Sequence, residues 1–334
     1  MLNPSAPYFP ILKMPPWFPG QLGVPGSDSP LGARYATGAV VIYVDENNSL
    51  ASDNNDGTDP MYPKSTIASA VASTILTTGS VIMVASEATI VENVIVPSTA
   101  PKNVTIMGCI DGSFQPTWTA ATGVCLTLRQ QSWRVCGFHF IGPADDTGTC
   151  IRVEWDGTDT INASFALIDH NVFDGQWSGK YGIVHWGSPY NVRVLENMFM
   201  EFKHGDATGF AIYGAVAPTA NALEWVIAGN TFWLNENHIG SLANDNGFNC
   251  SLIANNFFHA GANAGLIQTV LKLDTRGGST GENLVVGNIL PGDYSNVGGY
   301  YGSGATADIW IGNYTNDVAE AEASAVGLTI LPPA

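Results

Sequence analysis

A short pattern recurs along this chain at intervals of a few tens of residues. Eight segments between residues 104 and 313 each place a run of mostly apolar residues before a Gly or an Asn. These positions are Gly108, Gly137, Asn171, Asn197, Asn230, Asn256, Asn288 and Asn313, which by subtraction lie 29, 34, 26, 33, 26, 32 and 25 residues apart. Such a period is typical of stacked structural repeats rather than of an ordinary globular core.

Gly and Asn suit this position because they adopt left-handed backbone angles most readily, as a sharp bend between strands requires. Large apolar residues follow two positions later and are expected to point inward: Ile110, Phe173, Phe199, Phe232, Phe258 and Leu290. Stacked Asn side chains can also bond to one another along the axis as a ladder. A second set of glycines, Gly182, Gly209, Gly240 and Gly265, predicts the start of a further strand in each repeat.

A repeat of this length accommodates three short strands and three corners. In a parallel coil each strand pairs with its equivalents above and below at about 4.8 Å, so seven intervals give a rod of roughly 34 Å. We therefore predict an all-β chain that forms a single right-handed parallel β-helix, with its rungs and C-terminal tail in residues 104–334. A β-sandwich with Asn-rich turns is the alternative, but it would not repeat the local sequence so closely.

The chain before the repeats divides into two parts. Residues 1–39 form an extended arm, because eight of the 19 prolines fall within residues 1–30 and exclude regular helix or central strand. Residues 40–103 are expected to form the N-terminal cap and first strands, including a short amphipathic helix within Ser65–Leu76. The arm carries large apolar residues that either pack along its own domain or dock on a partner: Tyr8, Phe9, Ile11, Leu12, Met14, Trp17 and Phe18.

The charge balance restricts the partners. The net charge is −17, with 12 basic against 29 acidic residues, and no basic cluster interrupts the pattern. Nucleic acids and anionic membranes are therefore excluded as partners. An acidic polysaccharide would bind slowly unless a cation bridged it.

The cysteines and the N-terminus bear on the compartment. The five cysteines, among which pairing within residues 109–150 is the alternative, are typical of small core residues in a reducing cytosol. The N-terminus has no basic start followed by an apolar stretch, so no secretory signal is expected. No stretch approaches the roughly 18 apolar residues of a membrane span.

Residues 40–110 resemble the opening of pectate-lyase-like parallel β-helix proteins. The resemblance rests on the strand Val41–Val44, the loop Asp53–Pro60, Pro63–Ile67 with Ala70, and the strands in Gly79–Val84 and Ile90–Val94. It implies the β-helix fold but no single activity, because enzymes, adhesins and many phage proteins share this opening. A short apolar arm on a small β-helix most resembles phage virion proteins that decorate a capsid, and viral members imply a homotrimer.

The residues favour a protein that is not an enzyme, and the alternative is a glycoside hydrolase or a polysaccharide lyase. Lyase chemistry would need a basic residue beside a calcium-holding carboxylate cluster, and the Lys and Arg residues are scattered over the rungs. Glycoside hydrolysis needs two carboxylates at a defined separation, for which the best set is Asp169, Asp174, Glu196 and Glu201. Their alternative role is to cap bends. The six histidines lack zinc spacing, and the Asp53–Asp59 loop is better explained by turn chemistry than by calcium. We expect neither metal nor cofactor.

Two functions follow from these features. The first is a non-enzymatic virion protein that decorates the capsid surface, with the arm docked on the major capsid protein or another virion protein. The second is a tailspike-like protein that binds or cleaves a surface polysaccharide, for which the chain offers the aromatics Trp155, Trp177, Trp186 and Trp233.

Overall fold

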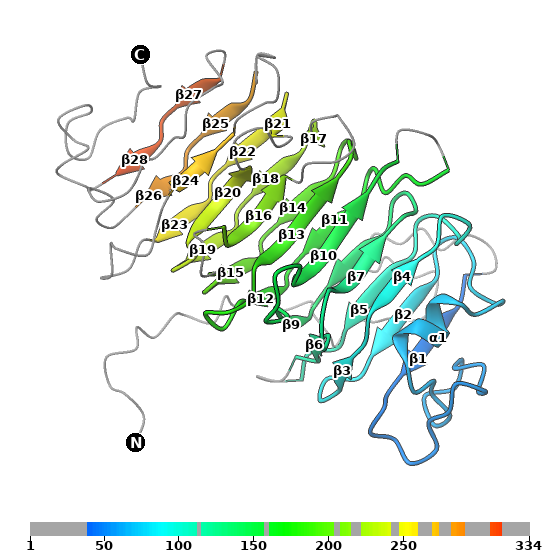
Figure 1. The fold of residues 1–334 in the computed structure, drawn as a ribbon. Helices are drawn as coiled ribbons and strands as arrows, with labels where there is room; N and C mark the ends of the chain where they lie inside the picture. The colour runs from blue at the N-terminus through cyan, green and yellow to red at the C-terminus, as the bar shows by residue number, and fades with distance from the viewer. Residues whose placement is uncertain are drawn as a thin grey trace, which may run out of the picture.

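A computed structural model describes residues 39–111, 115–156, 160–203, 208–214, 222–241, 247–259, 269–273, 282–290 and 308–315. These residues form a right-handed coil of stacked parallel strands (Figure 1). The predicted fold class is therefore confirmed. The predicted docking residues Tyr8–Phe18 lie outside the described residues, and so do most of the arm and the C-terminal tail.

Three parallel sheets form the sides of the coil, and each takes about one strand from every rung. Sheet A holds, in spatial order, β1 (Val41–Val44), β2 (Val81–Val84), β5 (Thr105–Gly108), β8 (Arg134–Cys136), β11 (Leu167–Asp169), β14 (Arg193–Leu195), β18 (Val226–Ala228), β22 (Leu252–Ala254), β25 (Leu284–Val286) and β27 (Ile309–Ile311). Sheet B holds β3 (Thr89–Val91), β6 (Thr117–Thr119), β9 (His139–Ile141), β12 (Val172–Asp174), β15 (Met198–Met200), β19 (Thr231–Trp233), β23 (Phe257–His259), β26 (Ile289–Leu290) and β28 (Tyr314–Thr315).

Sheet C holds β4 (Val94–Val96), β7 (Val124–Leu128), β10 (Thr149–Glu154), β13 (Tyr181–Trp186), β16 (Phe210–Gly214), β20 (Asn237–Ser241) and β24 (Thr269–Lys272). A small fourth sheet pairs β17 (Ala222–Leu223) with β21 (Phe248–Asn249). Because side chains alternate along a strand, the middle residue of each three-residue strand of sheet A from β8 to β25 points inward. From Val135 to Val285 these residues are completely buried, and each contributes roughly 2 kcal/mol of burial.

An aromatic column fills the interior beside sheet B. Phe140, Phe173, Phe199 and Phe232 stack ring on ring, with centroids 4.7 to 5.2 Å apart. The predicted inward positions from Phe173 to Leu290 are confirmed as buried. Ile110 is the exception. The register pairs Trp118 with Phe140, so Trp118 takes the place predicted for Ile110, which is only partly buried.

The predicted asparagine ladder is present and lies inside the coil. The Asn171 side-chain amide donates to Oδ1 of Asn197 at 3.1 Å, and Asn197 donates in the same way to Asn230 at 3.1 Å. The series continues through Asn256 and Asn288 to Asn313 with distances of 2.8 to 3.0 Å. These side chains are almost fully buried, so each rung is tied to the next in the core.

The reason proposed for the asparagines was wrong. The left-handed residue of each bend is the one before the Asn, as at His170 with φ 55° and Gly229 with φ 68°. Gly137, with φ 81°, belongs to this left-handed row, because Arg134 pairs with Leu167 and the predicted alignment is therefore shifted by one residue. Asparagine recurs because the buried ladder needs a side chain that both donates and accepts.

The second glycine row is also corrected. Gly240 lies within β20 and pairs with Tyr213, whereas Gly209 precedes β16. Gly182 lies within β13, and Gly265 lies outside the described residues. These glycines therefore occupy different places in their rungs.

A single short helix appears among the described residues. It is α1 (Ile67–Val71), which is shorter than the predicted segment and begins after Thr66, whose side chain accepts from Ser69 N. The Glu92 carboxylate accepts from the backbone N–H groups of Ile67 and Ala68, which have no partner within the helix. No helix in the described part of the chain is long and apolar enough to cross a membrane.

The cysteines are unpaired in this structure. Cys125, Cys136 and Cys150 are buried, as predicted for small core residues, whereas Cys109 is partly buried and Cys250 is exposed. Burial raises the pKa of the Cys125 and Cys136 thiols to about 12, which disfavours the reactive thiolate.

One histidine in the core makes the fold sensitive to acid. His238 is fully buried between the rings of Phe232 and Phe258, and burial, together with nearby His259, lowers its pKa to about 3. An unfolded histidine keeps a pKa of about 6.5, so the unfolded state binds more protons below that pH and stability falls as the pH falls. Between pH 7 and pH 4 we expect the free energy of unfolding to fall by about 3 kcal/mol less in His238→Leu than in the unchanged protein. Urea unfolding at both pH values measures this difference, and equal losses in the two proteins would contradict it.

Candidate functional site

The four carboxylates predicted as a hydrolytic set lie at two successive bends. Asp169 ends β11, and Glu196 follows β14 in the next rung. Asp174 ends β12, and Glu201 follows β15. The set is therefore divided into an Asp169–Glu196 pair at the bend between sheets A and B and an Asp174–Glu201 pair at the bend after sheet B.

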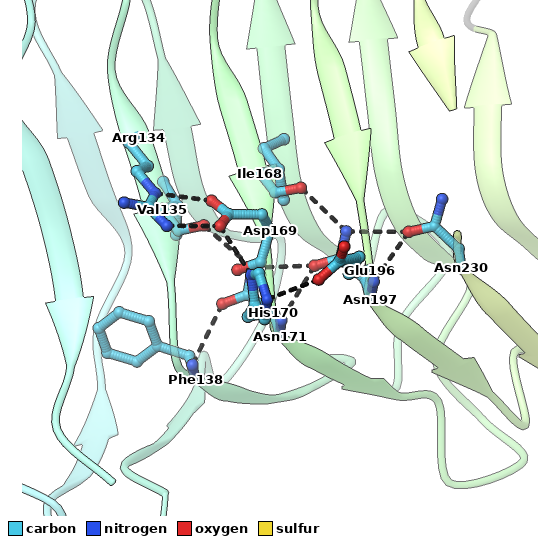
Figure 2. A network of polar contacts seen from close by, with 10 residues as sticks. All are labelled: Arg134, Val135, Phe138, Ile168, Asp169, His170, Asn171, Glu196, Asn197 and Asn230. Atoms are coloured by element: carbon cyan, nitrogen blue, oxygen red, sulfur yellow. Dashed lines mark hydrogen bonds and ion pairs between the residues drawn. The ribbon is translucent and has the colours of Figure 1, made fainter. Parts of the chain in front are cut away.

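The first pair is held in a network of polar contacts with Arg134 and His170 (Figure 2). Arg134 binds Asp169 through two hydrogen bonds, from Nε to Oδ1 at 2.8 Å and from Nη2 to Oδ2 at 2.6 Å. The ring of His170 lies between the carboxylates, with Nδ1 2.8 Å from Asp169 Oδ2 and Nε2 2.7 Å from Glu196 Oε2. Arg134 and Asp169 belong to the neighbouring strands β8 and β11 of sheet A, and Glu196 directly follows the next strand, β14.

The electrostatics of this network indicate a structural role. Burial alone would raise the pKa of Asp169, but the hydrogen bonds from Arg134 and His170 outweigh it and hold the pKa below its usual value. The hydrogen bond to Asp169 also raises the pKa of His170 against the effect of burial. Asp169 is therefore a carboxylate anchored by Arg134 and His170 rather than a free acid or base.

The second pair, Asp174 and Glu201, is not bound by an arginine in the described part of the chain. Asp174 Oδ1 accepts from Gln176 N at 2.8 Å, and its Oδ2 lies 3.6 Å from His139 Nε2. Partial burial, and then the negative charge of Asp174, raise the pKa of Glu201. A carboxyl with a raised pKa beside a second carboxylate is one requirement of acid–base chemistry on glycosides. Trp177, at the same bend, is 42% exposed.

A hollow of about 310 Å³ opens on the outer face of sheet C, and we call it the Trp186 hollow. Arg152 and Glu154 lie on the outward side of β10, because their neighbours Ile151 and Val153 are completely buried. The full lining is Arg129, Arg152, Glu154, Trp155, Asp156, Ile161 and Trp186.

The polar groups of the Trp186 hollow are held in place by one another. Glu154 Oε2 accepts from Arg129 Nε at 2.5 Å, and Glu154 Oε1 lies 2.5 Å from Arg152 Nη2. The Arg152 guanidinium lies over the Trp186 ring, 5.5 Å from its centroid, and Trp186 itself is 38% exposed. Among the described residues, Arg152 Nε and Trp155 Nε1 have no hydrogen-bond partner although both atoms are buried. The hollow therefore combines an accessible aromatic ring with preorganised hydrogen-bond donors and acceptors.

The sequence identified only part of this hollow. Trp155 and Trp186 were among the predicted surface aromatics, but Arg152 was considered scattered, and Arg129 and Glu154 were not identified. The signal was the alternation Arg152-Val153-Glu154, which places both charged residues on one face of a strand. The other two predicted aromatics lie elsewhere, Trp177 at the bend after β12 and Trp233 stacked 3.9 Å from His259.

The loop considered for calcium is occupied by the protein's own groups. Lys64 Nζ donates to the backbone oxygens of Asp53 and Asn55 at 3.0 and 2.7 Å. The Asp53 carboxylate accepts from Ser65, Thr66 and Ser69. These contacts are the predicted turn chemistry. In the part of the chain that the structure describes, no three His, Cys, Asp or Glu residues gather to hold a metal ion.

Comparisons with known proteins identify structures with a similar fold. No family model and no curated protein matches this sequence. A rhamnogalacturonan lyase has a similar structure, with a TM-score of 0.52 and 12% identity over 76% of this chain and 68% of its own. An alginate lyase from Paenibacillus sp. gives 0.49 and 14% over 74% of this chain and 92% of its own. A tailspike protein of E. coli bacteriophage HK620, in complex with a pentasaccharide, gives 0.42 and 13% over 73% of this chain and 49% of its own. At these identities the likeness shows the fold alone, and the chain is a right-handed parallel β-helix protein.

Proposed function

We propose that this protein binds a saccharide in the Trp186 hollow. The observation that carries the proposal is the accessible Trp186 ring beside Glu154 and its two arginines. Sugar rings present an apolar C–H face that packs on an aromatic ring and hydroxyl groups that bond to planar polar side chains. Ligand sites of this kind combine apolar contact with a few fixed polar groups.

The charges of the Trp186 hollow favour an uncharged ligand. Arg129 and Arg152 are balanced by Glu154 and Asp156, so the lining carries no formal net charge. The whole chain carries −17, which opposes the approach of anions. A neutral sugar unit meets these conditions, because its hydroxyls both donate and accept hydrogen bonds.

The test is a binding measurement with a matched tryptophan control. The full chain is applied to an array of neutral oligosaccharides and purified bacterial surface polysaccharides, and bound glycans are titrated by calorimetry. We expect Trp186→Ala to weaken binding by at least about tenfold, since a stacked aromatic ring contributes on the order of 1.5 kcal/mol. Trp177→Ala removes a similarly exposed ring outside the hollow and should leave the affinity unchanged. Equal losses in both variants, or no bound glycan, would reject the proposal.

Cleavage of a glycan would be a separate activity, carried by the Asp174–Glu201 pair at the bend after sheet B and not by the Trp186 hollow. Release of reducing ends during the same incubation would show it, and Asp174 and Glu201 are the carboxylates to replace, because Asp169 and Glu196 are engaged by Arg134 and His170. Asp174→Asn and Glu201→Gln should then abolish release without abolishing binding.

The second candidate function is a virion protein that decorates a capsid through residues 1–39. The uncommon richness of this arm in apolar residues and prolines supports it. Capsid decoration would be tested by cosedimentation of the full chain with phage particles that lack this protein. If a chain without residues 1–39 still cosediments, the arm is not the anchor.

A further inference from the structure

Four successive strands of sheet A present an uncharged outer face. In β18, β22 and β25 the outward residues alternate with a buried middle residue, and Ile309 and Ile311 of β27 pair in register with the outward residues of β25, so every outward residue is apolar. They are Val226, Ala228, Leu252, Ala254, Leu284, Val286, Ile309 and Ile311. We call this surface the β18–β27 face. We infer that in the isolated protein it is covered by the apolar segment of the N-terminal arm, residues 8–18.

The exposure of this face is concentrated on β25 and β27, because Val226, Ala228, Leu252 and Val286 are half-buried and Ala254 is 6% exposed. Ile309 is 57% exposed, Ile311 is 54% exposed and Leu284 is 36% exposed. Around the adjoining corner, Ile289 and Tyr314 of sheet B are 48% and 49% exposed. A contiguous apolar surface on a chain of net charge −17 marks a contact site, because scattered apolar residues would be separated by charged ones.

The shape of the face suits an extended segment. Small residues lie along it and along the corner, including Ala228, Ala254 and the left-handed Gly287 and Gly312. Four strands at about 4.8 Å spacing span roughly 14 Å, and three residues of strand span about 10 Å. This footprint is far smaller than the roughly 800 Å² per partner of a stable protein interface. Its size therefore favours a peptide segment over a second copy.

The arm matches this surface in composition. Residues 8–18 include seven large apolar side chains, and Lys13 is their one charged residue. Pro10, Pro15 and Pro16 lack the N–H group that strand pairing requires, so this segment would lie on a sheet face through its side chains instead of extending the sheet edge.

The arm can also reach the face. The described chain enters sheet A at β1, and eight to nine strand spacings, about 38 to 43 Å, separate β1 from β25 and β27, which carry the exposed residues of the face. The 22 residues from Phe18 to Val40 span about 68 Å when extended at roughly 3.1 Å per residue. The C-terminal tail instead follows β28, at the open end of the coil.

Trypsin provides the test, because Lys13 lies inside the proposed docking segment. Cleavage after Lys13 is followed by mass spectrometry in the full chain and in a peptide of residues 1–24. Where opening is fast, cleavage tracks the population of the open state, so we expect the full chain to be cut at least about tenfold more slowly. Ile309→Asp with Ile311→Asp should bring the rate to within about twofold of the peptide.

The controls separate docking from unfolding and from other occupants. Val91→Asp with Ile95→Asp places the same charges at positions 59% and 51% exposed on sheets B and C, and should keep Lys13 protected. Trp17→Ser with Phe18→Ser should release the arm without altering any rung. Lys13 cut as fast in the full chain as in the peptide overturns the inference. Protection that survives Ile309→Asp with Ile311→Asp also overturns it. So does protection that falls on dilution as a dimer dissociates, or that is lost when Gly327–Ala334 is removed.

Discussion

Replacing Asn197 by leucine is expected to lower the free energy of unfolding by about 4 kcal/mol. Asn197 is completely buried, and its side chain accepts from Asn171 N at 3.0 Å and donates to Ile168 O at 2.9 Å. Leucine has a similar volume but bonds to neither group. Two buried backbone groups would then lack partners, each at a cost of about 1–3 kcal/mol, and the ladder would be interrupted between Asn171 and Asn230.

Asn47→Leu is the matched control. Asn47 is exposed, and its side-chain amide donates to Glu87 O, which solvent can replace. Urea unfolding of both variants should show a large loss for Asn197→Leu and less than about 1 kcal/mol for Asn47→Leu. Similar small losses in both would mean that the ladder contributes little, and that apolar burial alone holds the rungs together.

Replacing Arg134 by methionine is expected to cost about 3 kcal/mol at pH 7. The Asp169 side chain is 4% exposed and would lose its bidentate partner, which leaves a buried carboxylate with only His170. Because Asp169 titrates below its usual range in the native protein, the Arg134 interaction contributes stability above that range and loses it as the pH falls. The difference between the two proteins should therefore narrow when the pH is lowered from 7 towards 3.

Two further variants isolate this ion pair. Arg193→Met removes an arginine of the same outer face that is exposed, and should change the unfolding free energy by less than about 1 kcal/mol. Arg134→Met with Asp169→Leu replaces the whole pair by apolar groups and should recover most of the lost stability, since the unpaired charge is gone. A double variant as unstable as Arg134→Met would show that packing of the arginine, and not its charge, is what matters.

The local sequence was sufficient to predict the positions of residues that recur in every rung. The inward phenylalanines and the asparagine ladder recur at one place in the rung, and the register confirms their stacking. Ile110 and the glycine rows were misplaced for the opposite reason: rungs differ in length at their loops, so counting residues does not give the register there. At the bends, His170 and Glu196 take left-handed angles that are uncommon for residues other than glycine, and the contact between their side chains accompanies that conformation.

The amino-acid sequence by itself determined that this chain coils, because a buried row of apolar and amide side chains at a regular period can be satisfied only by stacking equivalent strands. Only the tertiary structure decided which polar residues meet. Glu154 and Trp186 come from neighbouring strands of sheet C, Arg129 directly follows a third, and the three share one hollow because Glu154 pairs in register with Trp186. A slip of one residue would turn each of these side chains to the opposite face of the sheet. Repetition along the chain therefore encodes the scaffold, whereas the register between rungs creates the site.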